Sequence, residues 1–226
     1  MKTQMKSHMR SQQAGFTLVE IAIVLVIIGL LLGGILKGQE LINSAKVKNL
    51  ANDFRVIPTY IYGYQDKFKA LPGDDAAAAT HVNGAANAAT PAGKQGNGVI
   101  EGNWNSTTQT DESFLFWQHV RLSNLAAGPT SVSDATYLPT NAVGGKVGIN
   151  SATSSQVEIQ GMTGTYQVCS TGILGKFAKQ LDVQMDDGNT ATGSLRVVPD
   201  GSALNTAATL TASIDDAANY TVCMTF

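Results

Sequence analysis

One apolar run near the N-terminus constrains this chain more than any other feature. From Phe16 to Leu36, the only charged side chain is that of Glu20. At a rise of about 1.5 Å per residue, a helix of this length spans roughly 31 Å, which matches the hydrocarbon core of a membrane. The sequence therefore predicts a membrane-spanning helix over residues 16–36.

The residues in front of this run have the character of a leader. Residues 1–15 carry Lys2, Lys6 and Arg10 and no acid. A secretory signal peptide would have a shorter apolar core, with a small cleavage-site residue after that core. Here the small residue, Gly15, stands before the core. Cleavage at this point would remove the leader and leave the helix in place.

The stretch GFTLVE, which runs from Gly15 to Glu20, resembles the processing signature of type IV pilins and pseudopilins. In that family a prepilin peptidase cuts after the glycine, and the new N-terminus is methylated. The resemblance implies that Gly15 and Phe16 are the processing residues, with the cut between them. An ordinary signal anchor could match the motif by chance. The coincidence of leader, motif and full apolar span favours the pilin-like interpretation.

The resemblance also implies a role for the acid in the apolar run. A lone carboxylate in lipid costs a few kcal/mol, and a cationic partner lowers that cost. Cleavage would create such a cation, the amino group of Phe16. Within one helix this group lies a turn from Glu20, and in a staggered filament it can meet the Glu20 of a neighbouring subunit. Phe16 and Glu20 are therefore the expected assembly residues, which would set the register between subunits.

Apolar side chains continue beyond the span at spacings of three and four residues, which is a helical pattern. They are Val47, Leu50, Phe54, Ile57, Ile61, Tyr64 and Phe68. Pro58 interrupts the pattern and is expected to bend the helix. We therefore expect one long helix, in which residues 16–36 form the transmembrane or filament-core part. Residues 37–70 would form an amphipathic continuation, packed on a head made by residues 71–226.

Four glycines lie in or just after the predicted membrane-spanning part of this helix, and the sequence leaves their role open. They are Gly29, Gly33, Gly34 and Gly38. Their GxxxG spacings permit close approach of another helix. Alternatively, they form a point where the helix can unwind in a filament, because each glycine costs about 1 kcal/mol relative to alanine.

The head is expected to contain loops and helices first and strands later. Residues 74–109 have loop composition. Residues 111–129 are expected to form a helix of about four turns, with Asp111 as its cap and His119 at its surface or boundary. A further helix is expected over residues 173–185.

Six later segments alternate β-branched or aromatic residues with polar ones, which is typical of strands. They are residues 146–151, 155–162, 165–170, 193–203, 208–215 and 219–226. The predicted fold class is α+β. A long N-terminal transmembrane helix packs on a globular head with an antiparallel β-sheet, which is the pilin-like arrangement.

The chain has two cysteines, Cys169 and Cys223. An exported head lies in an oxidising space, so we expect a disulfide, with free buried thiols as the alternative. The closed loop of about 55 residues would add roughly 4 kcal/mol to the free energy of unfolding in the chain-entropy model. A disulfide near the C-terminus resembles the pilin arrangement, whereas major pseudopilins of type II secretion more often lack it.

The sequence predicts no catalytic residues, no cofactor and no metal site. His81 and His119 lie far apart in sequence, and GxSxG, HExxH and CxxC motifs are absent. Residues 96–102, GNGVIEG, resemble GNGDG-type turns of pilin-like proteins, but at the alternate positions of this loop only Glu101 is acidic. Calcium binding by this loop is therefore not expected. The acidic turn 186–193 could hold a cation, although a solvated turn is favoured.

The charge of the head narrows the possible partners. Residues 70–226 contain six basic and thirteen acidic side chains, a net charge of −7. Such a surface repels nucleic acid, so no nucleic-acid partner is indicated. The resemblance implies instead copies of the chain and other pilins in a filament, a prepilin peptidase, and inner-membrane assembly machinery.

The resulting interpretation is a structural, non-enzymatic subunit of a type IV pilus-like filament. It would lie in the inner membrane before assembly and then in an extracellular pilus. One alternative is a pseudopilin of a type II secretion system, in a periplasmic pseudopilus. The other is a membrane-anchored periplasmic binding module that never polymerises. Glu20 separates the filament from the anchor on this reasoning, because an anchor has no need of an acid in its span.

Overall fold

The computed structural model describes residues 17–153 and 156–226, so the processing residues Gly15 and Phe16 lie outside the described part. The chain divides into an N-terminal unit, Met1–Ile42, and a head unit, Asn43–Phe226. One helix continues through the boundary between them.

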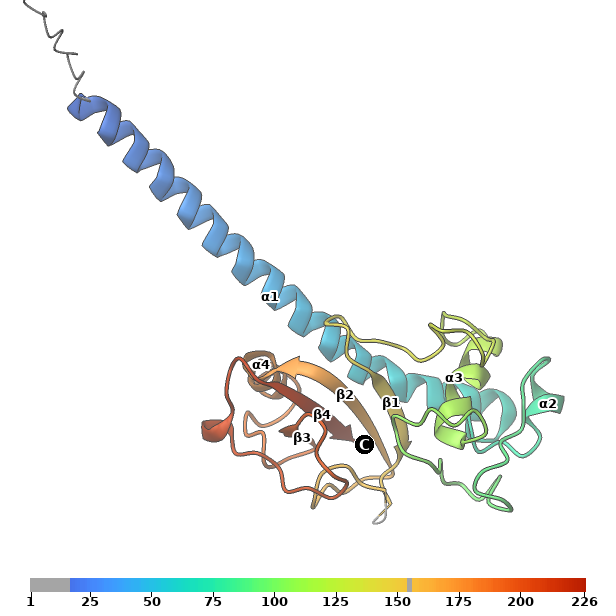
Figure 1. Ribbon diagram of the computed structural model, residues 1–226. Helices are drawn as coiled ribbons and strands as arrows, with labels where there is room; N and C mark the ends of the chain where they lie inside the picture. The colour runs from blue at the N-terminus through green and yellow to red at the C-terminus, as the bar shows by residue number, and fades with distance from the viewer. Residues whose placement is uncertain (1–16, 154–155) are drawn as a thin grey trace, which may run out of the picture. The chain divides into compact units, whose positions relative to one another are not determined.

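This helix, α1, runs from Leu18 to Phe68 without a break, close to the predicted limits (Figure 1). Pro58 lies inside it and is accommodated within the continuous helix. The helix ends where Lys69 adopts a left-handed conformation, with φ of 56°. Its buried side chains all belong to the head unit and follow the predicted spacing; they are Val47, Leu50, Ala51, Phe54, Ile57, Ile61 and Tyr64.

The head unit contains a four-stranded antiparallel sheet in the order β1-β2-β4-β3 (Figure 1). The strands are β1 Val147–Ser151, β2 Tyr166–Leu174, β3 Leu195–Pro199 and β4 Asn219–Thr225. The register between β2 and β4 shifts between Ser170 and Ile173, which is a bulge. A long apolar helix with an antiparallel sheet confirms the predicted α+β class.

Two of the six predicted strands are wrong. Of the segment 155–162 the structure describes residues 156–162, which make one isolated bridge, between Ile159 and Thr206. Residues 208–215 contain only the short 3₁₀ helix Thr211–Ser213. In the first segment Val157, Ile159 and Met162 are nevertheless buried, in a small core beside Cys169 and Cys223. Alternating apolar residues mark a half-buried surface, and here a loop supplies that surface without strand pairing.

The head has one short helix that was not predicted, and its two predicted helices are shorter than expected. They are α2 Ala78–His81, within the segment predicted as loop, α3 Glu112–Leu122 and α4 Gly175–Met185. The prediction that α3 extends towards Gly128 is wrong, because Asn124 ends it with a φ of 62°. The amide of Leu125 donates to the carbonyl of Val120, and that of Asn124 to the carbonyl of Arg121. These two bonds form a Schellman motif, which closes the C-terminus of the helix.

Two predicted roles within α3 are also wrong. Asp111 makes no capping hydrogen bond to α3, because its carboxylate accepts the hydroxyl groups of Thr90 and Ser106 instead. His119 lies neither at the surface nor at its boundary but is fully buried. The apolar face of α3 predicts that the residues next to His119 are buried. The burial of the imidazole itself depends on hydrogen-bond partners in distant segments, which the local pattern does not show.

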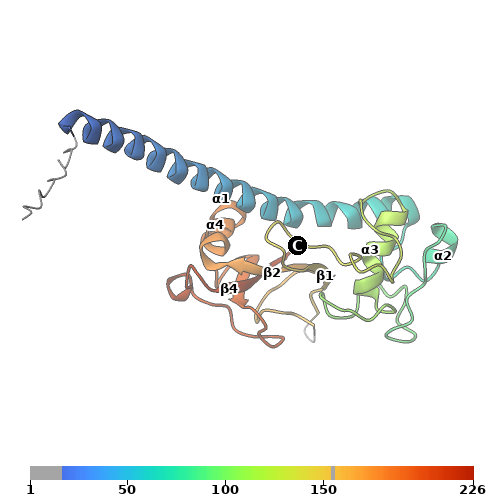
Figure 2. The same ribbon diagram turned by 45° about the horizontal axis from the view of Figure 1, so that its top comes forward.

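The core of the head unit joins the C-terminal half of α1 to α3, α4 and the sheet. In Figure 2, residues 43–68 of α1 run along one side of the head, above α4, β2 and α3. Phe54 of α1, Phe116 of α3 and Val222 of β4 belong to the same core and are 0% exposed. The periodic half of α1 is thus an integral part of the head.

Candidate functional site

The first turn of α1 is closed by a reciprocal pair of hydrogen bonds. The amide of Thr17 donates to Oε2 of Glu20 over 2.8 Å, and the amide of Glu20 donates to Oγ1 of Thr17 over 3.3 Å. The Thr17 hydroxyl also donates to Oε2, over 2.7 Å. Since α1 begins at Leu18, Thr17 is the N-cap and Glu20 the third helical residue, which is the geometry of a capping box.

This capping box is a role of Glu20 that sequence reasoning missed. The signal was present, because Thr-Leu-Val-Glu has the Ser/Thr-x-x-Glu/Gln spacing directly before an apolar helix. The box gives Glu20 a use within a single chain. The presence of the acid therefore does not by itself separate a filament subunit from an anchor. A pair between Glu20 and the amino group of Phe16 falls outside the described residues and stays a proposal.

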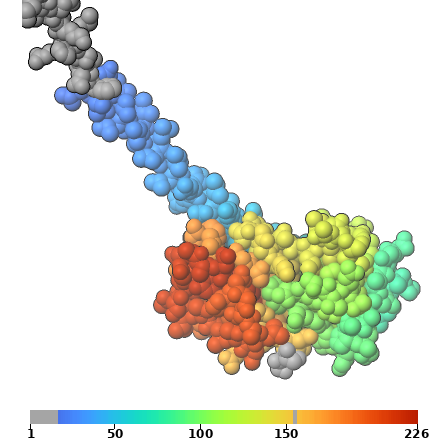
Figure 3. Space-filling view, in the orientation of Figure 1, coloured from blue at the N-terminus to red at the C-terminus, as the bar shows by residue number. Residues whose placement is uncertain are grey.

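The apolar side chains of the N-terminal unit are not buried against other residues of that unit. From Thr17 to Lys37 every described residue is exposed, and this part of α1 is shown in blue in Figure 3. Leu18 is 89% exposed and Leu30 is 74% exposed. Among the described residues, α1 alone is long and apolar enough to cross a membrane. A surface of this kind requires lipid or other protein around it.

The four glycines of this segment are not required by packing within the part of the chain that the structure describes. A Cβ atom added at any of Gly29, Gly33, Gly34 and Gly38 would meet no atom within 4 Å. α1 remains helical through all four positions, although each glycine weakens a helix relative to alanine. Any use of these glycines therefore lies outside the isolated chain, in helix contacts or in filament-dependent unwinding.

In the sheet, Cys169 of β2 lies directly opposite Cys223 of β4, and the two form a disulfide with an S–S distance of 2.06 Å. Both cysteines are 0% exposed. The C-terminal carbonyl of Phe226 accepts the amides of Thr165 and Tyr166, beside the start of β2. The disulfide and these bonds together hold the last strand and the C-terminus in the sheet.

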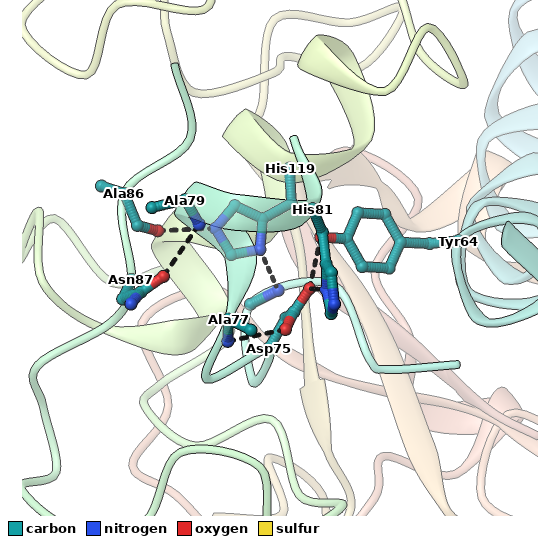
Figure 4. A network of polar contacts seen from close by, with 9 residues as sticks. Tyr64, Asp75, Ala77, Ala79, His81, Ala86, Asn87 and His119 are labelled. Carbon is teal, nitrogen blue, oxygen red and sulfur yellow. Dashed lines mark hydrogen bonds and ion pairs between the residues drawn. The ribbon is translucent and has the colours of Figure 1, made fainter. Parts of the chain in front are cut away.

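The two histidines of the head take part in a polar network at the end of α1 (Figure 4). Oδ2 of Asp75 accepts the Tyr64 hydroxyl over 2.9 Å and lies 2.7 Å from Nδ1 of His81. Oδ1 of the same carboxylate accepts the amide of Ala77 over 2.9 Å. These hydrogen bonds lower the pKa of Asp75, although burial opposes them. The network ties α1 to the segment that contains α2.

The buried imidazole of His119 connects two backbone segments. Its Nδ1 accepts the amide of Gly73 over 2.9 Å, and its Nε2 lies 2.8 Å from the carbonyl of Ala86. Nδ1 must be unprotonated to accept, so the ring is the neutral tautomer with its proton on Nε2. Burial lowers the pKa of His119, in agreement with this state. Both ring nitrogens are occupied by the backbone, which gives the residue a structural role.

A family model describes one part of this chain. Residues 10–36 match the prokaryotic N-terminal methylation motif. This motif is the signature of type IV pilins and pseudopilins, and it supports a protein of the type IV pilin-like class, which is generally non-enzymatic. No curated protein and no solved structure shows significant similarity to the chain.

Proposed function

We propose that this chain is a structural subunit of a type IV pilus-like filament. Its leader, residues 1–15, is removed by a prepilin peptidase between Gly15 and Phe16. The mature N-terminal helix is then held in the inner membrane and later transferred into the core of a helical filament. The function of the protein is assembly, and the disulfide-bonded head forms the outer part of the filament.

One observation carries this proposal: the exposed N-terminal half of α1 coincides in sequence with the methylation motif. Residues 17–37 expose their side chains along the whole helix, and residues 10–36 carry the motif. Lipid covers such a surface in the stored subunit, and the same surface of neighbouring subunits covers it in a filament. The transfer exchanges one apolar environment for another, so it requires little change in apolar burial.

Register between subunits is the task that we assign to Glu20. In a filament its carboxylate meets the amino group of Phe16 from an adjacent subunit. A subunit docked at the wrong height would leave both charges unpaired in apolar surroundings, which is far more costly than a correctly paired arrangement. The intrachain hydrogen bonds from Thr17 hold the carboxylate at the first turn of the helix.

Two other functions remain as alternatives with their own observations. A type II secretion pseudopilin would use the same helix and motif, and the Cys169–Cys223 disulfide favours a pilus over it. A non-polymerising anchored binding module is favoured only by the capping box, which explains Glu20 without any neighbouring subunit. Fibre formation separates these classes.

Mass spectrometry of sheared surface fibres tests the proposal. We predict that the subunit found in them begins at Phe16, with a methylated amino group. Replacement of Gly15 by valine should block cleavage, because a branched side chain then occupies the position before the cut. Subunit that retains Met1, or that begins after residue 30, would refute the proposed processing.

A further inference from the structure

Three carboxylates from separate segments of the head meet in one place. They belong to Asp74, just after the end of α1, to Glu101, in the loop of residues 96–102, and to Glu112, the first residue of α3. One oxygen atom from each lies within 4.8 Å of the others. These residues are separated by up to 38 positions in sequence, so only the fold brings them together.

The cluster is buried and incompletely hydrogen-bonded. Glu112 is 0% exposed and Asp74 is 2% exposed. Oε2 of Glu112 accepts the amide of Glu101 over 2.8 Å, but Oε1 of Glu112 has no hydrogen-bond partner. Oε2 of Glu101 is likewise buried without a partner. No ion pair among residues 17–153 and 156–226 involves any of the three acids.

The loop around Asp74 holds its carboxylate in a fixed orientation. Oδ1 accepts the amides of Gly96 and Asn97, over 2.5 and 3.2 Å, and Oδ2 accepts the amide of Gly98 over 2.8 Å. Gly96 and Gly98 have φ values of 80° and 83°, which favour glycine at both positions. Oδ1 thus accepts two amides, whereas Oδ2 accepts one amide and keeps a second lone pair free.

An arrangement of this kind needs a positive charge. Three carboxylates lie within 4.8 Å of one another, and two of them have a buried oxygen without a hydrogen-bond partner, so their charge must be compensated by a proton or a cation. A proton on Glu112 would satisfy part of the cluster by bridging to Glu101. A cation would compensate all three carboxylates at once.

We propose that Asp74, Glu101 and Glu112 form a binding site for a divalent cation, and that the cation is Ca²⁺. Oxygens that share one Ca²⁺ at 2.3–2.6 Å lie at most about 5 Å apart. The three carboxylate oxygens lie within 4.8 Å of one another, so one ion can bind all three. Mg²⁺ usually takes only one or two carboxylates and keeps several waters, so a set of three carboxylates favours Ca²⁺. Three carboxylates also match the preference of Ca²⁺ for charged oxygen ligands.

A surface cavity beside the cluster supplies room for the remaining ligands. It has a volume of about 440 Å³, and its lining includes Asp74, Asp75, Gly96 and Gly98. Ca²⁺ takes six to eight oxygens, so waters from this cavity complete its coordination. The bound ion fastens the loop after α1 and the loop of residues 96–102 to the start of α3. This site is independent of filament formation.

Calorimetry on the full processed chain in detergent tests the site. After treatment with a chelator and its removal, titration with CaCl₂ should show one ion per chain, and saturating Ca²⁺ should raise the unfolding temperature of the head. Glu112→Gln keeps an acceptor for the amide of Glu101 but removes one charge, and should weaken binding at least about tenfold. Glu101→Gln, at a half-buried position, should weaken it similarly and guards against misfolding of the Glu112 variant.

Glu158→Gln is the matched control. Glu158 is also a buried glutamate with a pKa raised by burial, but its carboxylate accepts the indole N–H of Trp104 and lies outside the cluster. The Ca²⁺ affinity of the Glu158→Gln variant should equal that of the wild type. If the wild-type chain binds no Ca²⁺ at millimolar concentration, the proposal is overturned, and a shared proton compensates the cluster instead. Wild-type affinity in both the Glu101 and Glu112 variants would also overturn it.

Discussion

The two halves of α1 differ in what surrounds them, although they belong to one continuous helix. In the N-terminal half, residues 17–37 are all exposed and almost uniformly apolar. In the other half, residues 43–68, apolar residues recur at spacings of three and four and seven side chains are buried. The periodic half has its partner within the chain. The uniformly apolar half needs a partner outside it.

The acids in the two halves show the same contrast. Glu20 stands in the first turn, where the amide and hydroxyl of Thr17 donate to it. Asp53 lies half-buried against the head, in a cavity of about 120 Å³ that Tyr60 and Arg121 also line. Burial raises the pKa of Asp53 to about 6. Glu20 therefore caps the helix, whereas the ionised form of Asp53 lowers the stability of the head where the helix packs on it.

Truncating a large side chain in each half should separate their roles most strongly. Phe54 is 0% exposed, so Phe54→Ala should lower the free energy of unfolding of the head by about 3–5 kcal/mol. Leu31 is 61% exposed, and Leu31→Ala should leave that free energy unchanged. Chemical denaturation in detergent, followed by tryptophan fluorescence, measures both. Equal effects would contradict the division of α1 into two halves.

The disulfide should stabilise the head without affecting the membrane half. Its cysteines are 54 positions apart, so in the chain-entropy model the double variant Cys169→Ser, Cys223→Ser should lose about 4 kcal/mol of unfolding free energy. Membrane insertion of α1 should be normal, because residues 17–37 make no use of the disulfide. Alkylation of folded, exported protein provides a separate check. Two thiols that react without reductant would contradict the disulfide.

The sequence predicted those features that depend on local pattern. The length and uniform apolarity of residues 16–36 predict the N-terminal half of α1, and the spacing of three and four residues predicts the other half, almost to the ends of the helix. Three short features were missed although their signals were local. They are the capping box of Thr17 and Glu20, the Asn124 stop of α3, and the short helix α2.

The rest depends on contacts between distant segments. Residues 155–162 alternate like a strand in sequence, but the described residues 156–162 pack as a loop against the Cys169–Cys223 region. The burial of His119 requires Gly73 and Ala86 as partners, which lie 46 and 33 positions away. The acid cluster could not be predicted from the loop of residues 96–102, because Glu101 is the only acid in that loop. Asp74 and Glu112 belong to other segments, and the fold brings them next to Glu101.

Removing the half-buried acid of α1 should stabilise the head by a smaller amount, and only above acidic pH. The pKa of Asp53 is raised from 3.8 to about 6, so the folded state holds its proton more tightly than the unfolded state. Its contribution to stability is therefore favourable at low pH and is lost as the pH rises from about 4 to about 6. Allowing for solvent screening, Asp53→Asn should gain about 1 kcal/mol at pH 8.

This gain should be nearly absent at pH 3.5, where Asp53 is mostly protonated in both states. Thermal unfolding of wild type and variant at the two pH values measures the difference. Asp66→Asn is the control, since Asp66 is an exposed acid in the same half of α1 and should have little effect at either pH. A gain from Asp53→Asn that is equal at both pH values would contradict a raised pKa as its cause.

The central claim is that the exposed half of α1 is covered by other subunits, with the charge of Glu20 setting their register. Counting fibres and membrane-held subunit for Glu20→Gln, beside Glu20→Ala, tests it most directly. Glutamine keeps an acceptor for the amide of Thr17, and so keeps the capping box, but cannot pair with the amino group of Phe16. Alanine removes both functions. We predict normal cleavage, normal membrane abundance and few or no fibres for both variants. Wild-type fibre numbers for Glu20→Gln would contradict the claim and reduce Glu20 to a helix cap.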